Sequence, residues 1–233
     1  MKSTVKKGLM LLVLTVIVTG GAFAQVQGLS LGVRAIGIKP FYTPSSAVEK
    51  IAGASVDFEG GFGFGAAAQL SYNFTETVGL QFEVLYNSDN IKVQTSGIQI
   101  QTIKANSLLI PVLVRLGTTL WSGMELTGIG GLYFTIPMGD AEAITSSLLG
   151  PSQTTKNKWK SPYGAMAGVI LGYPLGPGLL FGDFRYGIDF FNTEFGTNGS
   201  YDEFFRKHAL HIGLGYSFLM EGYGYRRSGR YWR

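Results

Sequence analysis

The 233-residue chain contains no cysteine and only two histidines. Without cysteine it has no disulfide framework, no thiol nucleophile and no cysteine-ligated metal site. Charged residues are also scarce, at 15% of the chain, and the formal net charge of +4 comes from the two ends. Residues 25–220 hold 12 basic and 14 acidic side chains. The body of the chain therefore offers no basic surface for phosphates, and we expect no nucleic-acid partner.

Long apolar runs are missing everywhere except near the N-terminus. Three lysines precede the apolar run 8–18, and small residues follow it as far as Ala24. This pattern predicts a signal peptide at residues 1–24, export through the general secretory route and a mature chain that begins at Gln25. The run is too short for the roughly 20 residues of a spanning helix. An exported chain that is 45% hydrophobic and lacks such a helix is either a soluble β-protein or an outer-membrane β-barrel.

The chain does have a repeated two-residue alternation, which is clearest in segment 62–74. Its even positions carry large apolar side chains such as Phe64, Leu70 and Tyr72, and its odd positions carry small or polar ones such as Gly63 and Gln69. Side chains on a strand alternate between the two faces of a sheet, so this segment predicts a strand with one apolar and one polar face. Seven further segments alternate in the same way, near residues 28–38, 78–87, 107–116, 124–136, 163–173, 180–190 and 207–218.

The composition of the two faces distinguishes the two β classes. A soluble barrel would turn its apolar face inward and show charges outside. Here the apolar face is bulky, as in Val112 and Leu214, while the other face holds glycines and a few opposed charges, as in Glu83 and Arg115. This pattern favours an outside that meets lipid and a narrow inside that is packed. We expect an all-β, eight-stranded antiparallel transmembrane barrel at residues 25–220, with a soluble β-sandwich as the alternative.

The connections support the same interpretation, because outer-membrane barrels pair short periplasmic turns with longer outer loops. Short links are predicted at 75–77, 117–123 and 174–178, and long polar links at 40–61, 139–161 and 192–204. A further outer link near residues 94–97 is tight. Ten strands would result if the first or third outer loop contained a hairpin.

Two short segments resemble known outer-membrane families. His211, Gly213, Tyr216 and Phe218 match the β-signal that such barrels present to the barrel-assembly machinery, although the chain continues 15 residues beyond Phe218. Segment 107–113, with its Ile-Pro pair, is similar to a strand of PorT-like outer-membrane β-barrel proteins. These resemblances imply a small barrel of the OmpA- or OmpW-like eight-stranded class in the bacterial outer membrane, and they imply no particular activity.

The inward charges are the most specific candidates for a site, and an isolated charge inside such a narrow barrel needs a partner. A turn centred on Leu120 would place Arg115 opposite Glu125, and one centred on Asn198 would place Asp189 opposite Lys207 and Arg185 opposite His211. We predict a lumen plugged by ion pairs and hydrogen bonds. The predicted lumen network consists of Arg34, Glu83, Arg115, Glu125, Asp183, Arg185, Asp189, Lys207 and His211.

The function that follows is a structural or interaction role in the outer membrane, as a monomer without cofactor or metal, through extracellular loops or a periplasmic tail. The alternative is a narrow channel or transporter for small or hydrophobic solutes. Neither His208 nor His211 has a recognisable serine and aspartate constellation, so we expect no enzyme. Partners would be membrane lipid, an extracellular ligand or a periplasmic protein.

Segment 156–160, with three lysines, is either a solvated loop or a contact for anionic head groups or a polymer. The basic and aromatic tail, 221–233, is either flexible or a docking segment.

Overall fold

A computed structural model describes residues 28–44, 56–95, 98–120, 123–145, 153–160, 163–197 and 200–220. The predicted signal peptide and the tail lie outside these residues. The described chain forms twelve β-strands and no helix long and apolar enough to cross a bilayer. The strands are β1 (Gly28–Pro44), β2 (Val56–Gly60), β3 (Gly63–Asn73), β4 (Val78–Thr95), β5 (Ile98–Thr119), β6 (Glu125–Pro137), β7 (Ala141–Thr145), β8 (Gln153–Lys160), β9 (Gly164–Leu175), β10 (Gly178–Asp189), β11 (Thr193–Thr197) and β12 (Ser200–Leu219).

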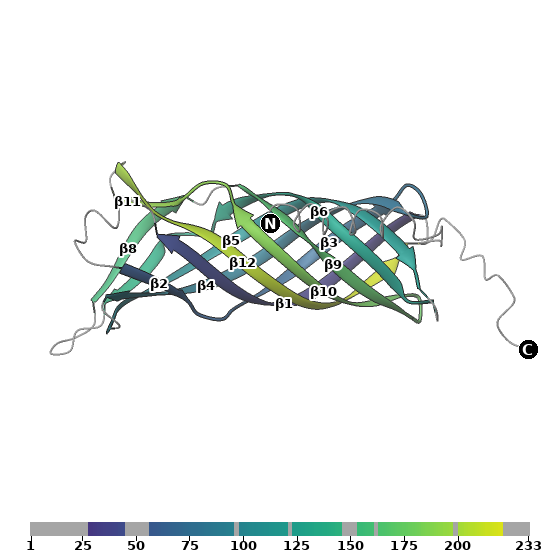
Figure 1. The fold of residues 1–233 in the computed structure, drawn as a ribbon, viewed down its shortest axis with the longest axis horizontal. Helices are drawn as coiled ribbons and strands as arrows, with labels where there is room; N and C mark the ends of the chain where they lie inside the picture. Colours follow the sequence, from purple (N-terminus) through teal and green to yellow (C-terminus); the bar gives the residue numbers. More distant parts are fainter. Residues whose placement is uncertain are drawn as a thin grey trace, which may run out of the picture.

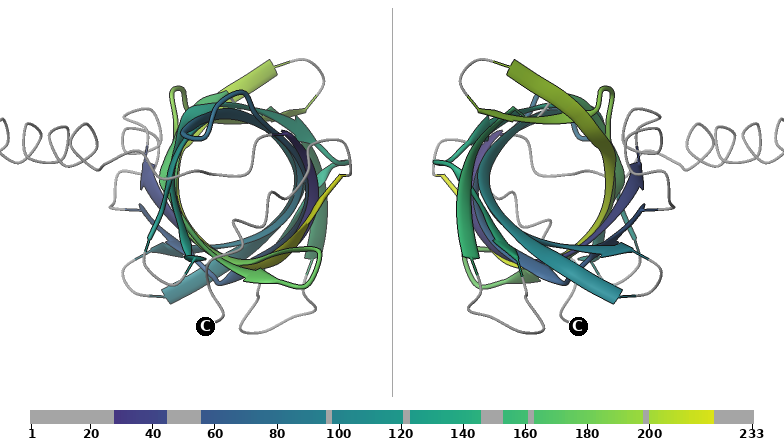
Figure 2. Two further views of the ribbon diagram at one scale, coloured as in Figure 1. Left: turned by 90° about the vertical axis from the view of Figure 1, so that its right-hand side faces the viewer. Right: turned by 90° about the vertical axis from the view of Figure 1, so that its left-hand side faces the viewer.

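Eight of these strands close into a barrel. Antiparallel ladders join β1 to β3, β3 to β4, β4 to β5, β5 to β6, β6 to β9, β9 to β10, β10 to β12, and β12 back to β1. The strands cross the barrel obliquely, and the views along its axis show a closed ring (Figures 1 and 2). Closure leaves no free sheet edge around the ring, which is the condition for a β-structure in a bilayer. The prediction of eight barrel strands is confirmed.

The other four strands extend one end of the barrel, here named the extended end. β7 pairs with β5 and β8, β11 pairs with β8 and β12, and β2 pairs with the last residues of β4. The predicted long loops at 40–61, 139–161 and 192–204 are therefore wrong in part, because each contains strand. The link at 139–161, the third outer loop in chain order, does contain a hairpin, β7–β8. This hairpin lies beyond the eight-stranded ring and adds no strand to it. The opposite end, named the turn end, carries the short links at 74–77 and 176–177.

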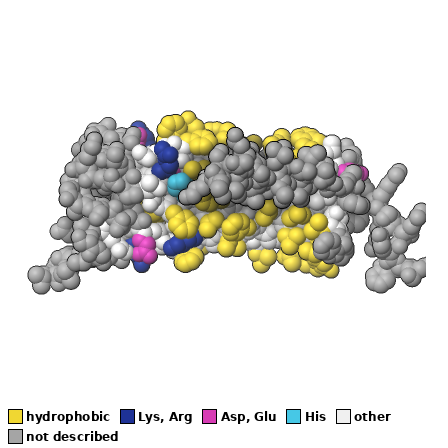
Figure 3. Space-filling model, in the orientation of Figure 1, with side chains coloured by type: hydrophobic (Ala, Val, Ile, Leu, Met, Phe, Trp, Pro, Cys, Tyr) yellow, Lys and Arg dark blue, Asp and Glu magenta, His cyan; other side chains and the backbone are white. Residues whose placement is uncertain are grey.

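The two faces of the wall are divided as the alternation predicts. Phe64, Val112 and Leu214 are 69%, 45% and 63% exposed on the outside, whereas Glu83 and Arg115 are 1% and 6% exposed inside. Hydrophobic side chains cover much of the barrel's outside, and cations and a histidine gather toward the extended end (Figure 3). The outside therefore has the lipid-compatible surface expected of a transmembrane barrel.

The inside is less polar than the sequence suggested. Inward positions also carry large apolar side chains, which form a buried cluster with Leu85, Leu113 and Phe181. A second apolar cluster fills the extended end and contains Ile91, Val93, Ile103, Ala105, Ala141, Ala143, Trp159 and Phe205. Polar and apolar side chains together fill the lumen, as expected for eight strands.

Candidate functional site

Four charged side chains meet inside the barrel in a closed ring of alternating sign, here named the ionic ring. Arg34 donates to Glu83 (Nη2–Oε2, 2.8 Å) and Arg185 donates to the other oxygen of Glu83 (Nη1–Oε1, 2.8 Å). Arg185 Nη2 lies 2.6 Å from Asp183 Oδ2, and Arg34 Nη1 donates to the same oxygen. All four side chains are 0% exposed. The ring brings together strands β1, β4 and β10, and its formal charge is zero.

Neutral amides continue this network toward the turn end. Gln81 donates to Glu83 and, at 3.3 Å, to Gln69. Arg115 donates to the Gln81 side-chain oxygen and, at 3.3 Å, to Ser71 Oγ. Arg115 is thereby linked to the ionic ring through one glutamine. Buried charges cost several kcal/mol each unless they are paired and hydrogen-bonded, and here each guanidinium has at least one acceptor.

Glycine makes room for the ionic ring on β12. A Cβ atom at Gly213 would overlap Asp183 Oδ1, and one at Gly215 would overlap the ring of Phe181 and lie 2.6 Å from Arg34 Cβ. Both glycines face the lumen. Packing therefore explains why the β-signal segment has glycine at these two positions. Tyr216 and Phe218 of that segment lie on the outward side, with ring centroids 4.7 Å apart.

The predicted pairing of Arg115 with Glu125 is wrong. The ladder pairs Arg115 with Ile129 and Thr119 with Glu125. The β5–β6 turn lies about two residues further along the chain than predicted, next to Gly123, whose φ of 78° falls in the left-handed region that glycine tolerates. Arg115 and Glu125 nevertheless line one small pocket at the turn end.

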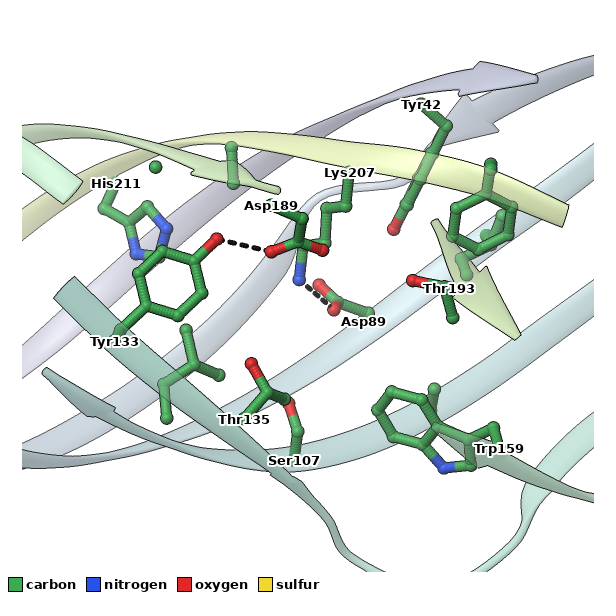
Figure 4. Close-up of a pocket in the computed structure, with 16 residues that line it drawn as sticks. Tyr42, Asp89, Ser107, Tyr133, Thr135, Trp159, Asp189, Thr193, Lys207 and His211 are labelled. Atoms are coloured by element: carbon green, nitrogen blue, oxygen red, sulfur yellow. Dashed lines mark hydrogen bonds and ion pairs between the residues drawn. The ribbon is translucent and has the colours of Figure 1, made fainter. Parts of the chain in front are cut away.

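A second polar site, the extended-end pocket, lies between the barrel and its extension (Figure 4). The centre of a water molecule can move within about 30 Å³ of it. Lys207 forms an ion pair with Asp89, to which Asn87 also donates (2.9 Å), and Tyr133 donates its hydroxyl to Asp189. The remaining lining residues are Tyr42, Ile91, Ala105, Ser107, Leu109, Thr135, Trp159, Gly187, Thr193, Phe205, Ala209 and His211.

The register predicted for the last hairpin is confirmed in part. Arg185 pairs with His211 in the β10–β12 ladder, whose last pair is Ile188 with His208. Lys207 and Asp189 line the same pocket, but the ion pair of Lys207 is with Asp89 on β4. Asp89 was absent from the predicted network because the strand was expected to end at residue 87. Odd-numbered residues of β4 face the lumen, so a longer predicted strand would have placed Asp89 in the network.

The described residues contain no group of three or more histidine, aspartate or glutamate side chains arranged to hold a metal ion. His208 lies apart from the lumen, on the outward side, where its Nδ1 is 2.9 Å from the Tyr186 hydroxyl. The side chains of the ionic ring and the extended-end pocket offer ion pairing and hydrogen bonding by carboxylates, guanidinium groups, an ammonium group, amides and phenols.

No protein-family model and no curated protein matches this chain. Solved structures do match it. The outer membrane protein OprG from Pseudomonas aeruginosa aligns with a TM-score of 0.56 at 14% identity, over 84% of this chain and 99% of that one. The outer membrane protein AlkL, solved in DMPC lipid bilayers, aligns with a TM-score of 0.51 at 14% identity, over 88% and 95%. Identity this low shows the fold alone. The chain has the eight-stranded antiparallel fold of the small outer-membrane β-barrel proteins.

Proposed function

We propose that the protein resides in the bacterial outer membrane as a barrel with a closed lumen, and that it acts through its extended end on the cell surface. The ionic ring carries this proposal. Its four side chains are fully buried and bind one another across the lumen, and the apolar cluster around Leu85 and Leu113 packs in the same interior. Such an interior holds the wall rigid and leaves no continuous water column.

The outward surface supports residence in a bilayer. The exposed hydrophobic side chains cover the barrel wall, and exposed cations such as Lys92, Lys104 and Arg206 follow further along the same strands toward the extended end. This order of side chains matches the change from acyl chains to head groups along the wall of a spanning barrel. Export by the predicted signal peptide, assembly through the β-signal and kinship with PorT-like barrels belong to the same proposal and rest on the sequence motifs.

Conductance tests the closed lumen directly. Purified full-length protein inserted into planar bilayers is expected to show no steady openings, because the ionic ring and the apolar cluster occupy the lumen. A porin inserted in parallel confirms that the bilayer reports channels. Gel migration with and without boiling confirms that the inserted protein is folded. Steady openings whose conductance changes in Arg115→Ala would contradict the proposal, and recovery of the protein in a soluble periplasmic fraction would contradict its location.

A second function, a side entry for hydrophobic solutes, is favoured by the place where the β6–β9 ladder of described residues ends. The β6–β9 ladder has its last pair at Tyr133 and Gly164, and the next pair of described residues along this wall is Ala141 with Asn157, between β7 and β8. Trp159 Nε1 donates to Gly139 O across this interval at 3.2 Å, and Trp159 also lines the extended-end pocket. A solute leaving the pocket sideways would pass this tryptophan.

Removing the tryptophan tests the side entry. In cells that produce the protein in their outer membrane, Trp159→Ala is expected to speed the entry of an apolar fluorescent dye, because it removes the side chain that contacts Gly139 beyond the end of this ladder. Leu214→Ala, on the outward face of β12, is the control and should leave entry unchanged. Equal entry rates in cells with the original protein, with either variant and without the protein would reject this second function.

A further inference from the structure

The extended-end pocket contains more polar atoms than the surrounding protein satisfies. Four lining residues, all buried or nearly so, each have a polar side-chain atom without a hydrogen-bond partner: Asp89 Oδ1, Asp189 Oδ2, His211 Nδ1 and the Tyr42 hydroxyl. Asp89, Asp189 and His211 are 5%, 3% and 2% exposed. Buried polar atoms normally have a partner, so four without one around a single pocket indicate that water or a ligand group binds there.

The charge of the pocket specifies the sign of that group. Two carboxylates line it, and the one lysine, Lys207, is engaged with Asp89. Asp189 accepts a hydrogen bond from the neutral hydroxyl of Tyr133 and is attracted by Lys207 at longer range. The lining therefore carries a formal charge of −1, because two carboxylates share one lysine. A cation that can donate several hydrogen bonds would satisfy this arrangement, whereas an anion would meet two carboxylates.

The other side of the same pocket is apolar and aromatic. Ile91, Ala105, Trp159 and Phe205 contribute to its lining, and the rings of Tyr42 and Phe205 pack edge to face with centroids 4.7 Å apart. These side chains belong to the apolar cluster of the extended end or pack against it. A ligand that fits both halves has a small cationic head and a short hydrocarbon body.

We infer that the extended-end pocket binds a small primary alkylammonium ion. Its ammonium group donates to the free oxygens of Asp189 and Asp89, and its alkyl chain lies against Trp159 and Phe205. A bare metal ion fits less well, because Lys207 already occupies one side of Asp89 and the described residues offer no metal-ligand cluster. The inference does not depend on whether the lumen conducts, because the pocket lies at the extended end of the barrel.

Nuclear magnetic resonance of the full-length barrel in detergent micelles tests this inference. The chain has three tryptophans, so ¹⁵N labelling of the indoles gives few signals, and Trp159→Phe assigns the one in the pocket. We expect n-butylammonium chloride to shift the Trp159 signal saturably with a Kd of about 1 mM, within the efficiency ceiling for about five non-hydrogen atoms. Neutral n-butanol, sodium butyrate and sodium chloride at equal concentration are expected to produce no saturable shift.

Three variants separate ammonium recognition from general effects. Asp189→Asn keeps an acceptor for Tyr133 but removes the charge, and it should weaken butylammonium binding by about tenfold or more. Lys207→Ala removes the cation that competes with the ligand for Asp89 and should strengthen binding by about tenfold. Asp140→Asn removes an exposed carboxylate outside the pocket and should leave the Kd unchanged.

Gel migration with and without boiling identifies the variants that are folded. If Asp189→Asn does not fold, the stronger butylammonium binding expected for Lys207→Ala still tests the inference. A Trp159 shift that n-butanol produces equally would overturn the inference, because it would show an apolar site without charge recognition. Absence of saturation, or a Kd that Lys207→Ala leaves unchanged or weaker, would overturn it as well.

Discussion

Glu83→Gln is expected to lower the free energy of unfolding by about 3–5 kcal/mol, the usual cost of removing one partner from a buried ion pair. Glu83 accepts hydrogen bonds from Arg34 and Arg185 through different oxygens, and all three side chains are fully buried. After the substitution, Asp183 is the one carboxylate left in the ionic ring for two guanidinium groups. The excess positive charge in the lumen is destabilising, because the packed interior cannot hydrate it.

Urea unfolding of the barrel in lipid vesicles, followed by tryptophan fluorescence, measures this loss. Glu76→Gln is the matched control. Glu76 lies exposed in the β3–β4 turn, and its loss should change stability by less than about 0.5 kcal/mol. The double variant Arg34→Met with Glu83→Gln leaves Arg185 and Asp183 balanced, so it should be more stable than Glu83→Gln alone. Equal stability of Glu83→Gln and Glu76→Gln would show that the ionic ring does not support the fold.

Residue parity allowed the faces of the wall to be predicted from sequence. A strand of period two assigns every second residue to one side, so Arg34, Glu83, Asp183 and Arg185 could be placed inside before any contact was known. Their meeting could not be predicted, because the ring spans β1, β4 and β10. Only contacts between paired strands follow from a ladder register, while contacts across the lumen depend on the size and shear of the closed barrel.

The missed features have related physical causes. Leu85 and Leu113 lie in the inward series, but they are apolar, so composition alone gave no sign that the lumen contains an apolar layer. The strands β7 and β8 are short, and β8 is largely polar; pairing with β5 and β11 keeps them extended where their own sequence predicts a loop. The β5–β6 turn was predicted about two residues too early. Because the centre of a turn determines which residues of a hairpin face each other, this error gave Arg115 the partner Glu125.

A charge on the outer wall should be nearly as harmful as an unpaired charge inside. Leu214 is 63% exposed near the middle of the outward apolar series of β12. Leu214→Arg is therefore expected to destabilise the barrel in a bilayer by about 2–4 kcal/mol, the cost of arginine at the midplane of a membrane. Asn106→Arg is the control, because Asn106 faces outward beyond the apolar part of β5, where the same side chain costs about 0–1 kcal/mol.

Both variants are compared with the original protein by urea unfolding in vesicles. The difference between them separates a lipid-facing wall from a water-facing one. In a barrel surrounded by water, arginine at position 214 would replace an exposed apolar side chain with a hydrated one and change stability by less than about 0.5 kcal/mol. Equal stability of Leu214→Arg and Asn106→Arg would therefore show that acyl chains do not cover this face, and would contradict the assignment of the outward residues to lipid.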